Sequence, residues 1–144
     1  MPSVDIQIRD KRFWRLLFPY SFCRHVIESA WSENPESEIS VVLADDSFVH
    51  ALNKKYRGKD KPTNVLSFEN EGLCAGDIVV AYGVLAREAR EQHKSFRAHL
   101  AHLLVHGTLH LQGYDHLTDK QAQKMENMER KIMQQLGYPD PYKE

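Results

Sequence analysis

The sequence predicts one small domain of the α+β or mixed α/β class. Short segments in which apolar and polar residues alternate, typical of half-buried strands, are interspersed with longer segments whose apolar residues recur at helical spacing. Together they predict about four short strands and about five helices. The length of 144 residues corresponds to roughly one domain, so we expect residues 1–144 to fold as a unit.

The first half of the chain is expected to alternate strands and helices. Alternation predicts one strand around residues 4–8 and another around residues 39–43. Apolar residues that share one helical face predict a helix over residues 22–31 and a second over residues 48–56. The second helix has cap residues at both ends, with Asp45 or Asp46 at its start and Gly58 at its end.

The second half begins with two strands, Val65–Phe68 and Ile78–Ala81, of which the second is continuously apolar, as a central strand would be. Three helices follow. The first runs roughly from Val84 to Gln92, and the second runs from the cap residue Ser95 to about Leu111. The last helix has a capping box at its start and breaking residues at its end, namely Thr118, Gln121, Gly137 and Pro139.

Composition excludes several classes of protein. With 42% hydrophobic residues, 27% charged residues and a formal net charge of −1, the chain is neither disordered nor coated in positive charge. Its longest apolar run is Ile78–Tyr82, far short of the roughly 20 residues that cross a membrane. No signal-peptide pattern opens the chain, so we expect a cytoplasmic protein in which Cys23 and Cys74 are reduced thiols.

Three of the eight histidines fall within the segment His106–His116. His106 and His110 lie four residues apart on an expected helix, so about 40° of rotation separates them and both project from one face. Gly113 can turn the chain and return His116 toward them. Three imidazoles in this arrangement suit one metal ion and leave a fourth tetrahedral position for water, which is typical of a catalytic site.

Three other residues refine this expectation. His102 also lies four residues from His106, but it is two turns, about 12 Å, from His110, so we expect it to pack beside the site without binding the metal. Gly107 stands where the zinc-peptidase motif HExxH has its general base, which argues against that mechanism. Asp115 is a candidate catalytic residue that orients a ligand imidazole or contacts the metal's water, or else a turn residue; the sequence leaves both open.

Positive charge is concentrated between Lys54 and Lys61, where five of eight residues are basic. This run spans a helix end and a loop that leads into a strand, a setting in which donors converge on an anion. Arg57 suits bidentate contact with a phosphate, whereas lysines follow a nucleic-acid backbone as point charges. If the fold brings this loop to the histidines, the two together predict metal-assisted attack on a phosphodiester.

These segments resemble the YbeY family of bacterial ribosomal RNA maturation factors, which are zinc-dependent endoribonucleases. Residues 106–116, HGTLHLQGYDH, match the family signature HGxLHLxGYDH. Residues 56–68, YRGKDKPTNVLSF, resemble its block YRGKDxPTNVLSF, and Gly76–Ile78 resembles its GDI strand. The chain departs from the family at Glu69, where proline is common, and with Glu71 it adds negative charge near the expected RNA path.

The resemblance implies an α+β fold with a small mixed sheet of four strands flanked by about five helices. It implies one Zn²⁺ per chain on His106, His110 and His116, and single-strand-specific cleavage of RNA. The expected partners are ribosomal RNA precursors and the small ribosomal subunit, in maturation of small-subunit ribosomal RNA and in ribosome quality control, with no membrane. The resemblance gives Arg57 a catalytic and substrate-binding role. Because Lys59 and Lys61 are positively charged, we expect them to contact the RNA as well.

Two other functions agree with the same residues. One is a metal hydrolase that acts on an ester or amide of a small substrate. It would keep the metal, and its activity would change neither with Arg57→Ala nor with salt concentration. A non-catalytic ribosome assembly factor binds ribosomal RNA or protein and uses the metal to stabilise its fold, so chelation destabilises it severely. The sequence also leaves open whether water or a neighbouring 2′-hydroxyl group attacks the phosphorus.

Overall fold

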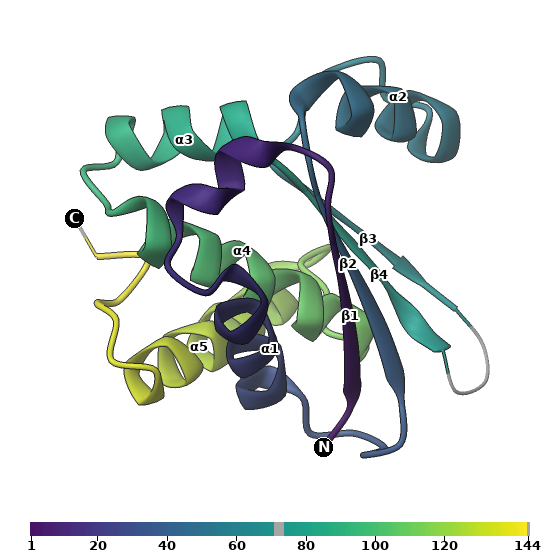
Figure 1. The fold of residues 1–144 in the computed structure, drawn as a ribbon. Coiled ribbons are helices and arrows are strands. Elements are labelled where there is room, and N and C mark those ends of the chain that lie inside the picture. Colours follow the sequence, from purple (N-terminus) through teal and green to yellow (C-terminus); the bar gives the residue numbers. More distant parts are fainter. Residues whose placement is uncertain (71–73, 144) are drawn as a thin grey trace.

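A mixed four-stranded sheet forms the centre of the fold, with strand order β1-β2-β4-β3 (Figure 1). The computed structural model describes residues 1–70 and 74–143. Strands β1, β2 and β4 are parallel, and the edge strand β3 is antiparallel to β4. Their bounds are Ser3–Ile8 for β1, Glu38–Ala44 for β2, Val65–Glu69 for β3 and Cys74–Ala81 for β4. The apolar segment predicted to be a central strand lies in β4, which is an inner strand and is buried from Ile78 to Ala81.

The helices confirm the predicted α+β class. They are α1 (Pro19–Ala30), α2 (Asp46–Arg57), α3 (Tyr82–Glu91), α4 (Phe96–Leu111) and α5 (Asp119–Gln135). A short 3₁₀ helix, η1 (Lys11–Arg15), was not predicted, because five residues are too few to show a period.

Local side-chain caps mark the starts of α2, α4 and α5. The side chains of Asp45, Ser95 and Thr118 each accept a hydrogen bond from a backbone N–H in the first turn of the helix that follows. Thr118 and Gln121 form the predicted capping box, in which each side chain bonds to the other residue's backbone. Gly58 ends α2 in the left-handed conformation, with φ of 67°. The predicted helix boundaries are confirmed to within a few residues.

The helices cover the two faces of the sheet unequally. Helices α1, α4 and α5 lie together on one face (Figure 1), where the larger apolar cluster joins them to residues of β1, β2 and β4. A smaller cluster on the other face includes Val49 of α2, Leu66 of β3 and Val79 of β4. Strand β4 is therefore packed on both sides, which explains its continuous apolar sequence.

Helix α4 is the central helix of the fold. It packs against α1, α3, α5, β3 and β4, and most of its side chains are buried. A helix that is apolar on nearly all sides is typical of a protein interior. Two of the predicted metal ligands, His106 and His110, lie on this helix, so the core itself holds them in place.

Two sequence-based expectations concern thiols and membranes. Cys23 is a free, buried cysteine, and burial raises the pKa of its thiol to about 12. The side chain of Cys74 lies outside the described part of the structure. Among the described helices, none combines the length and the apolar character that a membrane span needs.

Gly107 allows α4 to approach the sheet closely. A Cβ atom at this position would lie 3.0 Å from Cγ2 of Ile78 and 3.4 Å from Oγ of Ser67. Ile78 is fully buried in the central strand and has no room to move. The residue after His106 thus faces the sheet, where a glutamate general base of the HExxH type has no space.

We expect Gly107→Ala to lower the free energy of unfolding by about 1 kcal/mol, because overpacking of about 1–3 kcal/mol exceeds the gain in helix propensity of about 1 kcal/mol. Urea denaturation measures this change. In an Ile78→Ala background the substitution should be neutral or stabilising. An equal loss in both backgrounds would contradict the proposed contact between Gly107 and Ile78.

Candidate metal centre and its pocket

The fold brings the three predicted histidine ligands together. His106 and His110 occupy successive turns of α4, and Gly113, with φ of 94°, turns the chain after the helix ends. The loop then returns His116, so that one ring nitrogen from each histidine lies within 4.8 Å of the other two. This is the one group of metal-ligand type among the described residues, and three imidazoles form a donor set that suits zinc.

Hydrogen bonds at Nδ1 orient the imidazole rings of His106 and His110. Nδ1 of His106 lies 3.2 Å from a carboxylate oxygen of Glu129, and Nδ1 of His110 lies 2.9 Å from the carbonyl oxygen of Tyr114. Because an ionised carboxylate and a carbonyl only accept hydrogen bonds, each Nδ1 carries the proton and each Nε2 presents its lone pair. Both rings thus have the tautomer that binds a metal through Nε2.

The spacing of the Nε2 atoms fits a shared cation. They are 3.1 Å apart in His106 and His110. Two nitrogen ligands about 2.0–2.1 Å from one tetrahedral ion are separated by about 3.3 Å, and two lone pairs this close repel each other unless a cation lies between them. Burial, and then the neighbouring imidazoles, lower the pKa of His110, which keeps this ring neutral and able to bind a metal.

Glu129, on α5, is a site residue that the sequence analysis missed. Its side chain is fully buried, and its Oε1 atom accepts hydrogen bonds from His106 and, at 2.7 Å, from Nε2 of His102. Burial by itself raises the pKa of this carboxyl, but the two histidines outweigh that effect and lower the pKa to about 2. One sequence signal was present: Glu129 falls on the apolar face of the last helix, four residues after Met125 and three before Ile132.

His102 and Asp115 both lie near the ligands. His102 bonds to Glu129 and is not part of the three-histidine group, which agrees with the expectation that it packs beside the site. The Oδ1 atom of Asp115 accepts a hydrogen bond from the backbone N–H of His116 at 2.8 Å, the turn arrangement that the sequence left open. A carboxylate oxygen of Glu129, and not Asp115, lies within hydrogen-bond distance of the His106 ring, and a catalytic role of Asp115 stays a prediction.

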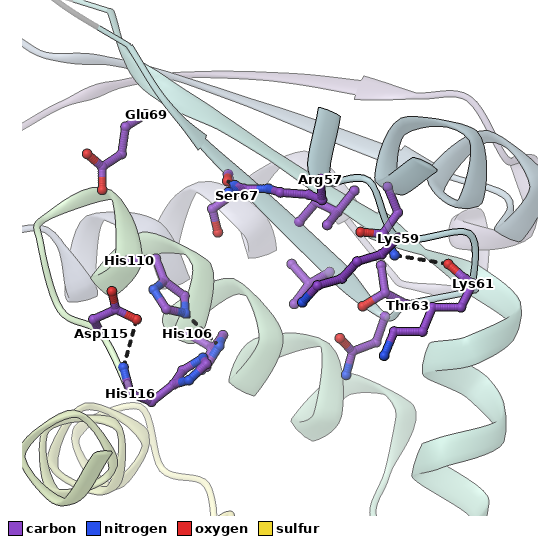
Figure 2. A pocket seen from close by; sticks show the side chains of 14 residues that line it. Arg57, Lys59, Lys61, Thr63, Ser67, Glu69, His106, His110, Asp115 and His116 are labelled. Carbon is purple, nitrogen blue, oxygen red and sulfur yellow. Dashed lines mark hydrogen bonds between the residues drawn. The ribbon is translucent and has the colours of Figure 1, made fainter. Parts of the chain in front are cut away.

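The three histidines share one pocket of about 710 Å³ with the basic loop, which is the segment from Arg57 to Lys61 at the end of α2. Figure 2 shows Arg57, Lys59 and Lys61 on one side of this pocket and the three histidines with Asp115 on the other. Strand β3 and the loop before it also line the pocket. The proximity that the sequence analysis had to assume is therefore present. Glu69 also lines the pocket, whereas Glu71 lies outside the described residues.

The basic run divides into two groups. Arg57, Lys59 and Lys61 line the pocket, whereas Lys54 lies 4.0 Å from Asp60 and Lys55 lies over the ring of Tyr56. The five charges therefore do not form one continuous patch. In this nearly neutral protein, three basic side chains line the pocket together with the carboxylates of Glu69 and Asp115.

Asn53 holds the basic loop in place, and the sequence analysis did not identify it. Its side chain is buried and donates to the backbone carbonyl oxygen of Lys61 at 3.0 Å. The backbone carbonyl oxygen of Asn53 accepts from the backbone N–H of Lys59 at 3.2 Å. Arg57 is fixed separately, since its Nη2 donates to the carbonyl oxygen of Ser67 and its guanidinium lies 5.0 Å from the ring of Phe68. The loop therefore has a defined shape.

The mixed α+β fold brings three histidines that could hold a metal ion into one pocket with basic side chains that could contact an anion. Residues 19–137 match the family model described as endoribonuclease YbeY. The chain belongs to this YbeY family.

Two relatives agree with that assignment, and a solved structure agrees with the fold. The endoribonuclease YbeY of Methylocella silvestris is 45% identical over 153 aligned positions, which cover 99% of this chain and 87% of the relative. That of Sinorhizobium medicae is 53% identical over 114 positions, which cover 74% of this chain and 68% of the relative. The solution structure of a Thermotoga maritima protein has a TM-score of 0.54, with 22% identity over the whole of both chains, and shows the same fold.

Zn²⁺ is expected to raise the unfolding temperature of the metal-free protein, because a ligand at 100 times its dissociation constant stabilises the folded state by about 2.7 kcal/mol. His116→Ala should lose most of this shift and leave the fold intact, since His116 is exposed. Thermal unfolding with and without zinc measures the effect. His25→Ala, which removes an exposed histidine far from the site in sequence, is the control; equal shifts in both variants would exclude His116 as a ligand.

Proposed function

We propose that this protein is a metal-dependent endoribonuclease that acts in the maturation of ribosomal RNA. The observation that carries this proposal is the single pocket in which the three histidines face Arg57, Lys59 and Lys61. The relatives at 45% and 53% identity carry the name endoribonuclease YbeY, which supports RNA as the anionic substrate. The functional unit is the single domain of residues 1–144.

One zinc ion per chain is the proposed metal, held by His106, His110 and His116. Nitrogen donors and a three-residue ligand set support zinc over calcium or magnesium, which prefer oxygen ligands. When bound, the ion supplies a Lewis acid that polarises a phosphoryl oxygen and lowers the pKa of water from 15.7 to about 7. Asp115, beside His116 in the pocket, is the proposed group for proton transfer there.

Arg57 is proposed to bind the phosphoryl group that is cleaved. One of its nitrogens is engaged by the Ser67 carbonyl, and the remaining N–H groups of the planar guanidinium are donors for two phosphate oxygens. Its contact with Phe68 and its bond to β3 keep the side chain preorganised. A donor held in this way stabilises the charge that develops on the phosphoryl oxygens during the reaction.

Lys59 and Lys61 are proposed to follow the RNA backbone away from the cleaved bond. Both are exposed and line the same side of the pocket as Arg57 (Figure 2). The family resemblance, together with the pocket that the basic loop shares with the histidines, supports single-stranded RNA as the substrate. The family resemblance supports precursors of small-subunit ribosomal RNA and the small subunit itself as partners, in rRNA maturation and in ribosome quality control, inside the cytoplasm.

Arg57→Ala is expected to reduce cleavage of a labelled single-stranded RNA about 100- to 1,000-fold, as loss of one preorganised donor does. His110→Ala should reduce it at least as far, because it removes a metal ligand. Arg24→Ala, which removes an exposed arginine outside the pocket, should cut like the wild type. If all four proteins, purified identically, cut alike, the activity is a contaminant, and a non-catalytic assembly factor or a small-molecule hydrolase replaces the proposal.

The double variant Lys59→Ala, Lys61→Ala should bind RNA with a weaker salt dependence. Each lost phosphate contact on a single strand lowers the slope of log K against log salt by about 0.7, so the expected decrease is about 1.4. Binding of the metal-free protein to a fluorescent RNA at several salt concentrations measures the slope. Lys54→Ala, Lys55→Ala removes the same charge from the same run outside the pocket, and an equal decrease in this control would place the RNA elsewhere.

A further inference from the structure

Glu129 is a charged residue in the core of the protein. Its side chain is fully buried on the inner face of α5, beside the core residues Met125, Ile132 and Met133 of the same helix. An ionised carboxylate in such surroundings is strongly destabilising unless its oxygens accept hydrogen bonds from well-placed donors. A glutamate at this position therefore requires an explanation beyond packing.

Three donors from two distant parts of the chain meet the carboxylate. Oε1 of Glu129 accepts from Nε2 of His102 at 2.7 Å and from Nδ1 of His106 at 3.2 Å, both on α4. Oε2 accepts from the hydroxyl group of Tyr142 at 2.8 Å. Burial and the nearby carboxylate raise the pKa of Tyr142, so this hydroxyl keeps its proton and remains a donor.

The segment that carries Tyr142 is anchored to two other parts of the chain. Nζ of Lys94 donates to the carbonyl oxygen of Pro141 at 2.6 Å, and Arg130 lies 3.2 Å from a carboxylate oxygen of Asp140. The ring of Tyr142 also packs edge-on against His102, with centroids 5.3 Å apart. The segment that places the Tyr142 hydroxyl beside Glu129 therefore has its own contacts to Lys94, in the turn between α3 and α4, and to α5.

We propose that Glu129 is a positioning residue for the metal centre and that Tyr142 holds Glu129 in place. The carboxylate retains the proton of His106 on Nδ1 and fixes the plane of the ring, so that Nε2 points toward Nε2 of His110. The C-terminal segment is thereby linked to a metal ligand through two hydrogen bonds. This inference rests on the metal site of the proposed function.

A purely structural role for Glu129 makes different predictions. If the carboxylate merely ties α5 to α4 through His102, its loss lowers the stability of the protein but leaves the tautomer of His106 and the zinc affinity of the folded molecules unchanged. The tautomer and the affinity therefore distinguish the two roles, and unfolding temperature alone does not.

The test compares Glu129→Gln with Glu126→Gln, which removes a partly exposed carboxylate from the same helix one turn earlier. In the metal-free wild type, ¹⁵N chemical shifts of His106 should report a proton on Nδ1. Glu129→Gln should shift part of the population to the Nε2–H form, because an amide is a weaker acceptor than a carboxylate. Zinc affinity, measured by competition with a chromogenic chelator, should fall about 10- to 100-fold.

Tyr142→Phe provides a second test that leaves the buried charge and the aromatic ring in place. It should weaken zinc binding by a smaller factor, about tenfold or less. Tyr138→Phe is its matched control, because Tyr138 lies in the same segment and bonds to Arg97 instead of Glu129. This variant keeps the inference testable if Glu129→Gln does not fold.

The outcomes separate the inference from the proposed function. Zinc affinities and His106 tautomers that are the same in Glu129→Gln and Glu126→Gln would overturn the positioning role while leaving the metal site intact. Failure of the wild type to bind zinc would overturn the metal site, and with it the role toward zinc. The tautomer, measured without metal, then still decides whether Glu129 orients His106.

Discussion

The burial of α4 is the constraint on which the rest of the site depends. This helix is enclosed by the sheet and three other helices, so neither end can shift without displacing the core. His106 and His110 are carried by the part of the helix that reaches the pocket, and their Nε2 atoms are held 3.1 Å apart. Core packing thus sets the separation of two of the candidate ligands, and only the third, His116, depends on a loop.

A second constraint follows from the first. Because α4 is buried on nearly every side, the Nδ1 atoms of His106 and His110 face the protein interior. Each inward-facing nitrogen needs an acceptor, and the acceptors are a carbonyl for His110 and a carboxylate for His106. The carboxylate in turn needs donors for its other lone pairs, which His102 and Tyr142 supply. Hydrogen bonds through Glu129 therefore connect the candidate metal centre to a polar network in the core and to the C-terminal segment.

The basic loop is built differently from the histidine cluster. Its charged side chains are exposed, and hydrogen bonds fix its backbone. Asn53 bonds to the loop at two points and Arg57 bonds to the edge strand β3. These contacts turn three cationic side chains toward the histidines and leave Lys54 and Lys55 outside the pocket. A protein with a net charge of −1 can in this way bind a polyanion at one place without attracting it everywhere.

Local patterns in the sequence determined the strands, the five helices and most of their boundaries, because caps and hydrophobic periods act over a few residues. The helical spacing of His106 and His110 and the turn at Gly113 likewise determined the three-histidine group, since all of it lies within eleven residues. The family resemblance added the mixed sheet and the RNA substrate, which no local pattern contains.

Tertiary structure alone decided which groups meet across elements. Glu129 was one glutamate among many in the sequence, and its contacts with His106 and Tyr142 join residues that are 23 and 13 positions away. The placement of Arg57 also depends on how α2 ends beside β3, because its guanidinium donates to the carbonyl oxygen of Ser67. Hydrogen bonds between side chains on different elements leave no period in the sequence, because their geometry exists only after the elements have packed.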